Sequence, residues 1–220
     1  MPDTSNPAAA INALAGPLIS RLIHDLMGPA TGLMTGVALL DDAATPRGEA
    51  VELVSTSLHA LVGLLNFCRA AYGAGDEPLS SGELGRLAAS LFEGARPSLD
   101  WAVTLDSLPA VAGRTLLGLV QVAAGALAAG GTVTATAFGD GAQIRIAVEA
   151  RGARLRLADE TVAGLMGRAC EGGRIGQWAP ACYLARQVVA AGGRLSTHPL
   201  NAGPLDTGIG GLGFEAVFPA

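Results

Sequence analysis

The first third of the chain repeats apolar residues at a spacing that predicts two long helices. In the second of them the steps alternate between three and four without a slip, at Val51, Val54, Leu58, Leu61, Leu65, Cys68 and Tyr72. This repeat is typical of a coiled-coil seam. A similar stripe in the first helix comprises Leu18, Leu22, Leu26, Pro29, Leu33, Val37 and Leu40, broadened by Ile23, Ala30 and Met34.

These two stripes predict a helical hairpin that fills a first domain over residues 1–75. The segment DDAATPRG separates the helices, with Thr45 as the expected N-cap and Pro46 as the first residue of the second helix. Two helices with wide apolar faces cannot bury them against each other alone. We therefore expect a homodimer in which two hairpins form a four-helix bundle.

Beyond a linker rich in Gly, Pro and Ser, the pattern changes to mixed helices and strands and predicts a second domain over residues 79–220. Ser80 and Glu83 have the spacing of a helix capping box, Asp140-Gly141 is a hairpin signal, and Gly192-Gly193 is a helix stop. We expect helices near 81–94, 113–128, 159–169 and 179–191, and strands at 101–105, 132–138, 143–149, RLSTH and FEAVF. This order predicts an α/β sandwich with helices on one face of a mixed sheet, and hence an α+β protein overall.

The composition excludes several classes of protein. Half of the residues are hydrophobic, and the formal net charge of −5 argues against a nucleic-acid partner, which needs a basic surface. All 14 basic residues are arginine, so Walker-A phosphate binding and Schiff-base chemistry are excluded for lack of lysine. Three cysteines, an odd number, lie at Cys68, Cys170 and Cys182 without metal-ligand spacing, so neither a disulfide framework nor a metal site is expected.

The sequence also predicts a cytoplasmic protein. No apolar run approaches the roughly 20 uncharged residues that a membrane span needs. The N-terminal segment MPDTSNPAAA lacks the basic start of a signal peptide. We therefore expect no membrane partner.

One motif inside the first helix carries candidate chemistry: Arg21-x-x-His24-Asp25-Leu26-x-x-Pro29. His24 lies two positions from both Leu22 and Leu26, so its side chain should point away from the apolar stripe toward solvent. Asp25 could accept a hydrogen bond from Nδ1 and leave Nε2 free to attack as a nucleophile. Pro29 should bend the helix, and Arg21, one turn before His24, could hold a phosphoryl oxygen or an acidic loop of a partner.

The same residues also allow a plainer interpretation. His24 can be an ordinary exposed histidine and Pro29 an ordinary kink. His59 and His198 have no supporting motif and are interpreted as exposed residues. Trp101 and Trp178 are interpreted as packing residues.

The motif resembles the H-box of histidine-kinase dimerisation domains, in which an acidic residue follows the histidine and a proline follows a turn later. Gly28 departs from that pattern, because kinases commonly carry Asn or Thr there, and this puts phosphatase activity in doubt. The second domain resembles the Bergerat-type ATP-binding domain of histidine kinases in its order of elements. By that resemblance, Gly125 stands in place of the Mg²⁺-binding Asn and Ala150 in place of the adenine-reading Asp. Arg154 replaces a glycine, so the ATP site should be lost.

Together these features resemble the histidine phosphotransferases of the ChpT type. The resemblance implies that His24 takes a phosphoryl group from a receiver-domain aspartate of a hybrid kinase and passes it to response-regulator receivers, with a role in cell-cycle control. Arg21, Gly28 and Pro29 would then contact the partner. The receiver would supply Mg²⁺, and this chain would bind no cofactor of its own. Two alternatives stay open: a dimeric scaffold or anti-kinase that transfers no phosphate, and an ATP-dependent kinase, which Gly125 and Ala150 disfavour.

Overall fold

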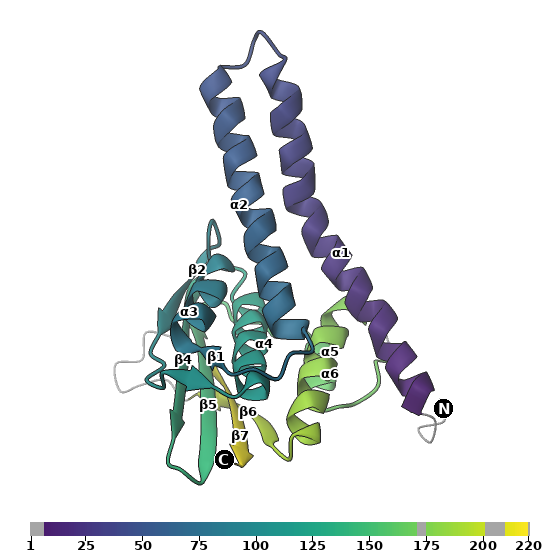
Figure 1. Ribbon diagram of the computed structural model, residues 1–220, viewed down its shortest axis with the longest axis vertical. Helices are drawn as coiled ribbons and strands as arrows, with labels where there is room; N and C mark the ends of the chain where they lie inside the picture. Colours follow the sequence, from purple (N-terminus) through teal and green to yellow (C-terminus); the bar gives the residue numbers. More distant parts are fainter. Residues whose placement is uncertain (1–6, 171–174, 201–209, 220) are drawn as a thin grey trace.

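The computed structural model describes residues 7–170, 175–200 and 210–219, and within α1 it describes side chains from Leu14 onward. An N-terminal helical hairpin projects from an α/β sandwich, and its turn end stands clear of the sheet (Figure 1). The hairpin consists of α1 (Pro7–Leu40) and α2 (Arg47–Tyr72). The predicted order of a helical hairpin followed by an α/β sandwich is therefore confirmed.

Small residues set the close approach of α1 and α2. A Cβ atom placed on Gly36 would lie 2.7 Å from Cγ2 of Val54, and one placed on Gly32 would overlap the hydroxyl of Ser57. Val54 of the predicted α2 seam faces α1, whereas Val51, Leu58 and Leu65 remain about half exposed. The hairpin thus buries only one edge of its apolar seam.

The start of α2 differs from the prediction by one residue. Pro46 is the N-cap and Arg47 the first helical residue, and no side chain caps the helix. The Thr45 hydroxyl instead donates a hydrogen bond to Asp42 Oδ2 at 2.9 Å, while Asp42 Oδ1 accepts one from the Ala44 N–H at 3.0 Å. Because Asp42 organises the turn with its own side chain, Thr45 is not available as the cap.

Among the described helices, α2 combines great length with a largely apolar composition. By these two criteria alone it could cross a membrane. Charged residues at Arg47, Glu49, Glu52 and Arg69 still interrupt α2, so it contains no uncharged run of roughly 20 residues. Core helices of soluble proteins can have the same length and composition, so these two properties do not show that α2 lies in a membrane.

A five-stranded mixed sheet forms the sandwich, with strand order β2-β4-β5-β7-β6. Only the pair β2 and β4 is parallel. The strands are β2 (Pro97–Trp101), β4 (Gly131–Gly139), β5 (Gln143–Gly152), β6 (Arg194–Leu200) and β7 (Gly210–Pro219). The helices are α3 (Ser81–Ser90), α4 (Ala110–Ala126), α5 (Asp159–Leu165) and α6 (Ile175–Ala190), and a two-stranded ladder joins β1 (Leu79–Ser80) to β3 (Ser107–Leu108).

Alternation along the central strands separates a core face from an outer face. Val133, Ala135 and Ala137 of β4 are buried under the helices, whereas Thr134 and Thr136 between them point to the other side. The centre of the core is α4, whose Leu116, Leu117, Leu119, Val120 and Ala123 are fully buried. Helices on one face of a mixed sheet are thus confirmed.

Local signals located most of these elements correctly. Ser80 caps α3 and its hydroxyl accepts a hydrogen bond from the Glu83 N–H at 3.2 Å. Asp140 closes the β4–β5 hairpin through two backbone N–H groups, and Gly141 adopts a φ of 84° that favours glycine. Gly192, with a φ of 72°, follows the end of α6.

The strand expected at residues 101–105 is the main error. The observed strand, β2, ends at Trp101, where the expected one begins, because the ladder with β4 extends only from Pro97 to Trp101. Val103 and Leu105 still pack against the core, so the alternation that suggested a strand reflects burial without strand pairing. The short strands β1 and β3 were not predicted.

Both helices of the hairpin pack against the sandwich. Leu14 of α1 packs with Trp178, Ala179 and Cys182 of α6. At the end of the second helix, Phe67 of α2 is fully buried in the core that surrounds α4. The segment of α1 between these contacts is thereby held at the junction of the two parts, and it contains His24.

Candidate functional site

His24 projects into solvent from the middle of α1. Its side chain is 81% exposed, which confirms the orientation that the apolar stripe predicted. The Nδ1 atom lies 3.2 Å from Asp25 Oδ1. If Nδ1 carries the proton, this hydrogen bond leaves the Nε2 lone pair directed outward.

Asp25 connects His24 to Arg21. The Nε–H of Arg21 donates a hydrogen bond to Asp25 Oδ2 at 2.7 Å, one turn along the helix. The Asp25 carboxylate thus has one oxygen toward each neighbour, and only 19% of its side chain is exposed. Such a pair of contacts fixes the carboxylate, and the fixed carboxylate orients the imidazole ring.

The side of Asp25 away from solvent faces the end of α2. Burial, together with the charge of Asp25, raises the pKa of the Cys68 thiol to about 11. Burial is also the main cause of a raised pKa of Tyr72, and the nearby Cys68 and Asp25 raise it further. Both groups therefore stay protonated at neutral pH, so Cys68 is not a nucleophile at this site. The Tyr72 hydroxyl donates to Gln121 Oε1 of α4 at 2.8 Å.

Exposed apolar side chains surround His24 on α1. Ile19, Ile23 and Met27 are each more than half exposed and lie within five residues of His24 along the helix. A Cβ atom added at Gly28 would meet no atom within 4 Å. Pro29 is half-buried and lies inside the continuous helix, and the bend expected there stays a prediction. The helix surface beside His24 therefore carries exposed apolar side chains next to the charged pair of Arg21 and Asp25.

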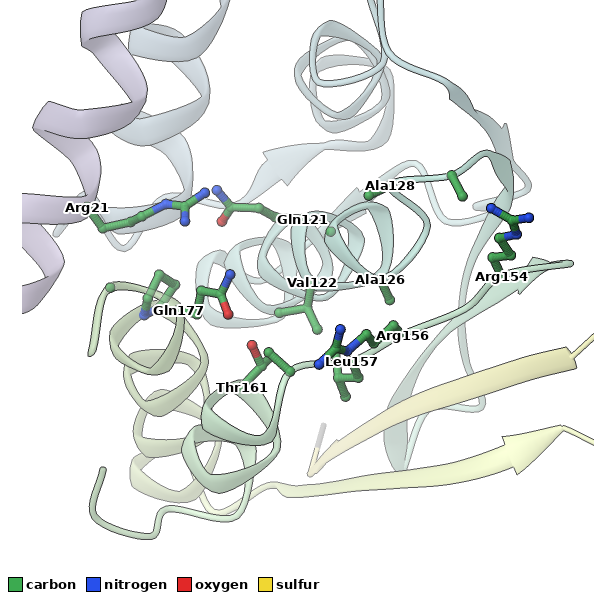
Figure 2. Close-up of a pocket in the computed structure, with 15 residues that line it drawn as sticks. Arg21, Gln121, Val122, Ala126, Ala128, Arg154, Arg156, Leu157, Thr161 and Gln177 are labelled. Carbon is green, nitrogen blue, oxygen red and sulfur yellow. The ribbon is translucent and has the colours of Figure 1, made fainter. Parts of the chain in front are cut away.

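A pocket of about 400 Å³ lies between α1, α4, α5 and α6, behind this surface (Figure 2). Arg21 lines it and reaches from α1 toward Gln121 (Figure 2). The Arg21 side chain is thus directed toward Asp25 and the pocket. The expected contact of Arg21 with an incoming phosphoryl group stays a prediction. Gly125 and Arg154, two of the positions that mark the loss of ATP motifs, also line the pocket, whereas Ala150 is fully buried in the core.

The other histidines lack a comparable setting. His59 is exposed on α2, and its Nδ1 contacts the Ser55 carbonyl oxygen 2.7 Å away, one turn earlier. His198 lies on the edge strand β6. In the described part of the chain no cluster of three or more His, Cys, Asp or Glu side chains could hold a metal ion.

Sequence reasoning missed the residues that surround the motif in space. Tyr72, Gln121, Arg156, Thr161 and Gln177 were not proposed as site residues, although all five lie in the junction or its pocket. Their elements are far apart in the sequence, so no local spacing links them to His24. The run Arg154-x-Arg156 was the one signal in the sequence for a basic cluster.

Comparison with known proteins gives a family match over more than half of the chain. A model described as the histidine phosphotransferase C-terminal domain matches residues 81–202. A curated relative, protein phosphotransferase ChpT of Brucella abortus (strain 2308), is 26% identical over 119 residues. That alignment covers 53% of this chain and 56% of the relative, so the chain spans little more than half the length of the relative it matches.

One solved structure has the same architecture as this chain. A bacterial phosphotransferase is similar with a TM-score of 0.80 at 24% identity, covering 98% of this chain and 99% of that one. A mycobacterial sensor histidine kinase, MprB, has a TM-score of 0.49 at 16% identity, covering 66% of this chain and 97% of its own. The first of these two likenesses shows that the fold, hairpin included, is shared with a phosphotransferase.

Proposed function

The chain belongs to the histidine phosphotransferase family, and we propose that His24 is the residue that carries the phosphoryl group. The observation that carries this proposal is an imidazole that is 81% exposed and has a carboxylate at its Nδ1 atom. An inert surface histidine needs no such partner. The exposed Nε2 is the nucleophile that phosphoryl transfer requires.

The proposed step is an in-line displacement. The Nε2 lone pair of His24 forms a bond to phosphorus, and the bond from phosphorus to the carboxylate oxygen of a receiver aspartate breaks with its electron pair on that oxygen. The ring of the phosphohistidine then carries positive charge if Nδ1 keeps its proton. Asp25, next to Nδ1, would stabilise that charge. Transfer to a second receiver is the same step in reverse.

The partner would supply the rest of the chemistry. A receiver domain of a hybrid kinase would donate the group, and response-regulator receivers would accept it. The receiver's Mg²⁺ would neutralise the phosphoryl oxygens, since this chain need supply only a positioned nucleophile. We propose that this chain binds no cofactor for transfer and is not an ATP-dependent kinase, because Gly125 has no side chain to hold a metal ion.

The open surface around His24 supports docking of such a receiver. Ile19, Ile23 and Met27 would give an apolar contact area. Gly28 and Pro29, which carry little or no side chain beyond the helix, would allow the partner to approach closely. Arg21 would contribute indirectly, because its hydrogen bond holds the Asp25 carboxylate in place.

We also propose that the chain is a cytoplasmic homodimer. Apart from the three residues assigned to the receiver, apolar residues about half exposed or more follow both helices of the hairpin: Met34 and Val37 on α1, and Val51, Leu58, Val62 and Leu65 on α2. An exposed apolar stripe of this length is unfavourable in water and requires a cover. A second hairpin with the same stripe would cover it and form a four-helix bundle.

The direct test of the function is transfer of label. A receiver domain phosphorylated with radioactive phosphate is incubated with this protein, and acid-labile, base-stable label on the chain is the expected result. Absence of label with several cognate receivers would favour the alternative, a scaffold that binds receivers without transfer. Binding alone does not discriminate the two, so the readout must be the covalent label.

Replacing Asp25 by Asn should slow transfer without removing the acceptor. The amide cannot stabilise the positive ring, and its NH₂ group can donate to Nδ1 and favour the wrong tautomer. We expect a rate at least about 10²-fold lower, in the range of general-base effects. The measurement is the rate of label uptake as a function of pH.

Asp41→Asn is the matched control, because Asp41 is an exposed carboxylate at the end of α1. It should transfer at the wild-type rate. An Asp25→Asn protein with an unchanged rate and pH profile would show that Asp25 does not act on His24.

A further inference from the structure

The ion pair of Arg21 and Asp25 needs support beyond its own attraction. The two residues are one helical turn apart, and the arginine is partly exposed. Such a pair on an open helix stabilises by less than the thermal energy, and fixing the long arginine side chain costs rotamer entropy. On α1 alone, Arg21 would therefore often leave Asp25, and the carboxylate would lose its fixed position beside Nδ1 of His24.

The sandwich confines Arg21 from two sides. A Cβ atom added at Gly176 of α6 would lie 3.8 Å from Arg21 Cδ and 3.9 Å from its Cβ, so α6 packs beside the aliphatic stem. The guanidinium extends toward the amide of Gln121 on α4 (Figure 2). Together α4 and α6 limit the rotamers of Arg21 to those in which its Nε–H reaches Asp25.

Tyr72, at the end of α2, fixes the Gln121 amide. The hydroxyl of Tyr72 carries one proton, which it donates to Gln121 Oε1 at 2.8 Å, and this oxygen has a second lone pair that can accept from a guanidinium N–H. Burial is the main cause of the raised pKa of Tyr72, and of its charged neighbours Asp25 raises that pKa and Arg21 lowers it. Tyr72 thus lies within range of both charges of the ion pair, while its proton is directed to α4.

From these contacts we propose that Tyr72 and Gln121 are positioning residues for phosphoryl transfer, a proposal that rests on the proposed role of His24. Tyr72 orients Gln121, which holds Arg21. Arg21 in turn holds Asp25 against Nδ1 of the imidazole. Neither Tyr72 nor Gln121 touches the reacting atoms. The sandwich acts on the nucleophile through this connection, and it favours the tautomer with a free Nε2.

Tyr72→Phe in the full chain tests the proposal, because it removes one hydroxyl and keeps the aromatic ring. At saturating phosphorylated receiver, transfer should be about three- to tenfold slower, the loss of one neutral hydrogen bond, and KM should be unchanged. Nitrogen-15 NMR without a receiver should show a smaller share of the Nδ1–H tautomer of His24. Gln121→Leu removes the acceptor instead of the donor and should give the same changes.

A double-mutant cycle tests whether Tyr72 acts through Asp25. In the Asp25→Asn protein, Tyr72→Phe should cause no further loss of transfer rate, because the carboxylate that it positions is already gone. Two losses that multiply would show that Tyr72 acts independently of Asp25 and would overturn the proposal.

Tyr183→Phe is the matched control. The ring of Tyr183 on α6 packs against that of Tyr72, with centroids 5.6 Å apart, and its hydroxyl accepts a hydrogen bond from Gln187 Nε2 at 2.6 Å. This variant should keep the wild-type rate and tautomer. An equal loss in Tyr183→Phe would reduce the effect to looser packing and overturn the proposal, as would an unchanged rate and tautomer in Tyr72→Phe. The tautomer is measured without phosphotransfer, so a wild type that takes no label would refute only the proposed function.

Discussion

His24→Ala should abolish the covalent label that a phosphorylated receiver leaves on this protein. The substitution removes the proposed nucleophile, and Asp25 with its carboxylate directed toward the missing ring cannot replace it stably. Because the side chain is 81% exposed, folding should change by only about 0.5 kcal/mol. Label uptake, measured beside thermal unfolding, separates loss of chemistry from loss of structure.

His59→Ala is the matched control, since His59 is the other exposed histidine of the described hairpin. It should accept label at the wild-type rate and to the same extent. Acid-labile label on the His24→Ala protein would refute the assignment and make His59 the candidate. Binding of the receiver should persist in both variants, because Ile19, Ile23 and Met27 are untouched.

Leu58→Asp should convert the proposed dimer into folded monomers. In one chain Leu58 is 47% exposed on α2, so the hairpin itself tolerates the carboxylate. In a four-helix bundle the same position is covered, and burial of an unpaired charge costs several kcal/mol, roughly, in each copy. Light scattering should report 22.0 kDa for the variant and twice that mass for the wild type.

Val189→Asp provides the comparison for this experiment. Val189 is 70% exposed near the end of α6, outside the helical hairpin, so the same change there should leave the dimer intact. Circular dichroism should show equal helix content in both variants. A wild-type protein that is monomeric at micromolar concentration would refute the dimer, and detergent-dependent solubility would instead favour a membrane cover for α2.

The candidate nucleophile could be predicted from the sequence because its setting is local. The phase of His24 relative to Leu22 and Leu26 fixed its direction on the helix, and the neighbouring Asp25 needed no distant contact to reach Nδ1. The Ser80 cap and the Asp140 turn were predictable for the same reason. Each depends on side chains within a few residues of the backbone groups they bind.

The sequence predicted less well how these residues contact the rest of the fold. Alternation through Val103 and Leu105 predicted pairing that the ladder with β4 does not provide, since the ladder ends at Trp101 although β4 continues to Gly139. The apolar seam of α2 predicted a bundle but not which of its positions face α1. Gly32 and Gly36 decide that, through contacts with Ser57 and Val54 across the hairpin.

By itself, then, the sequence determined the helical hairpin, the α/β sandwich and an exposed histidine with its carboxylate, since all three follow from periodicity and short-range spacing. Only the tertiary structure placed that histidine at the junction of the two parts. There α6 packs against α1, and Tyr72 of α2 binds Gln121 of α4. It also brought Arg21 to the pocket of Arg154 and Arg156. These contacts join residues that are distant along the chain, and such pairings arise from packing that no local pattern encodes.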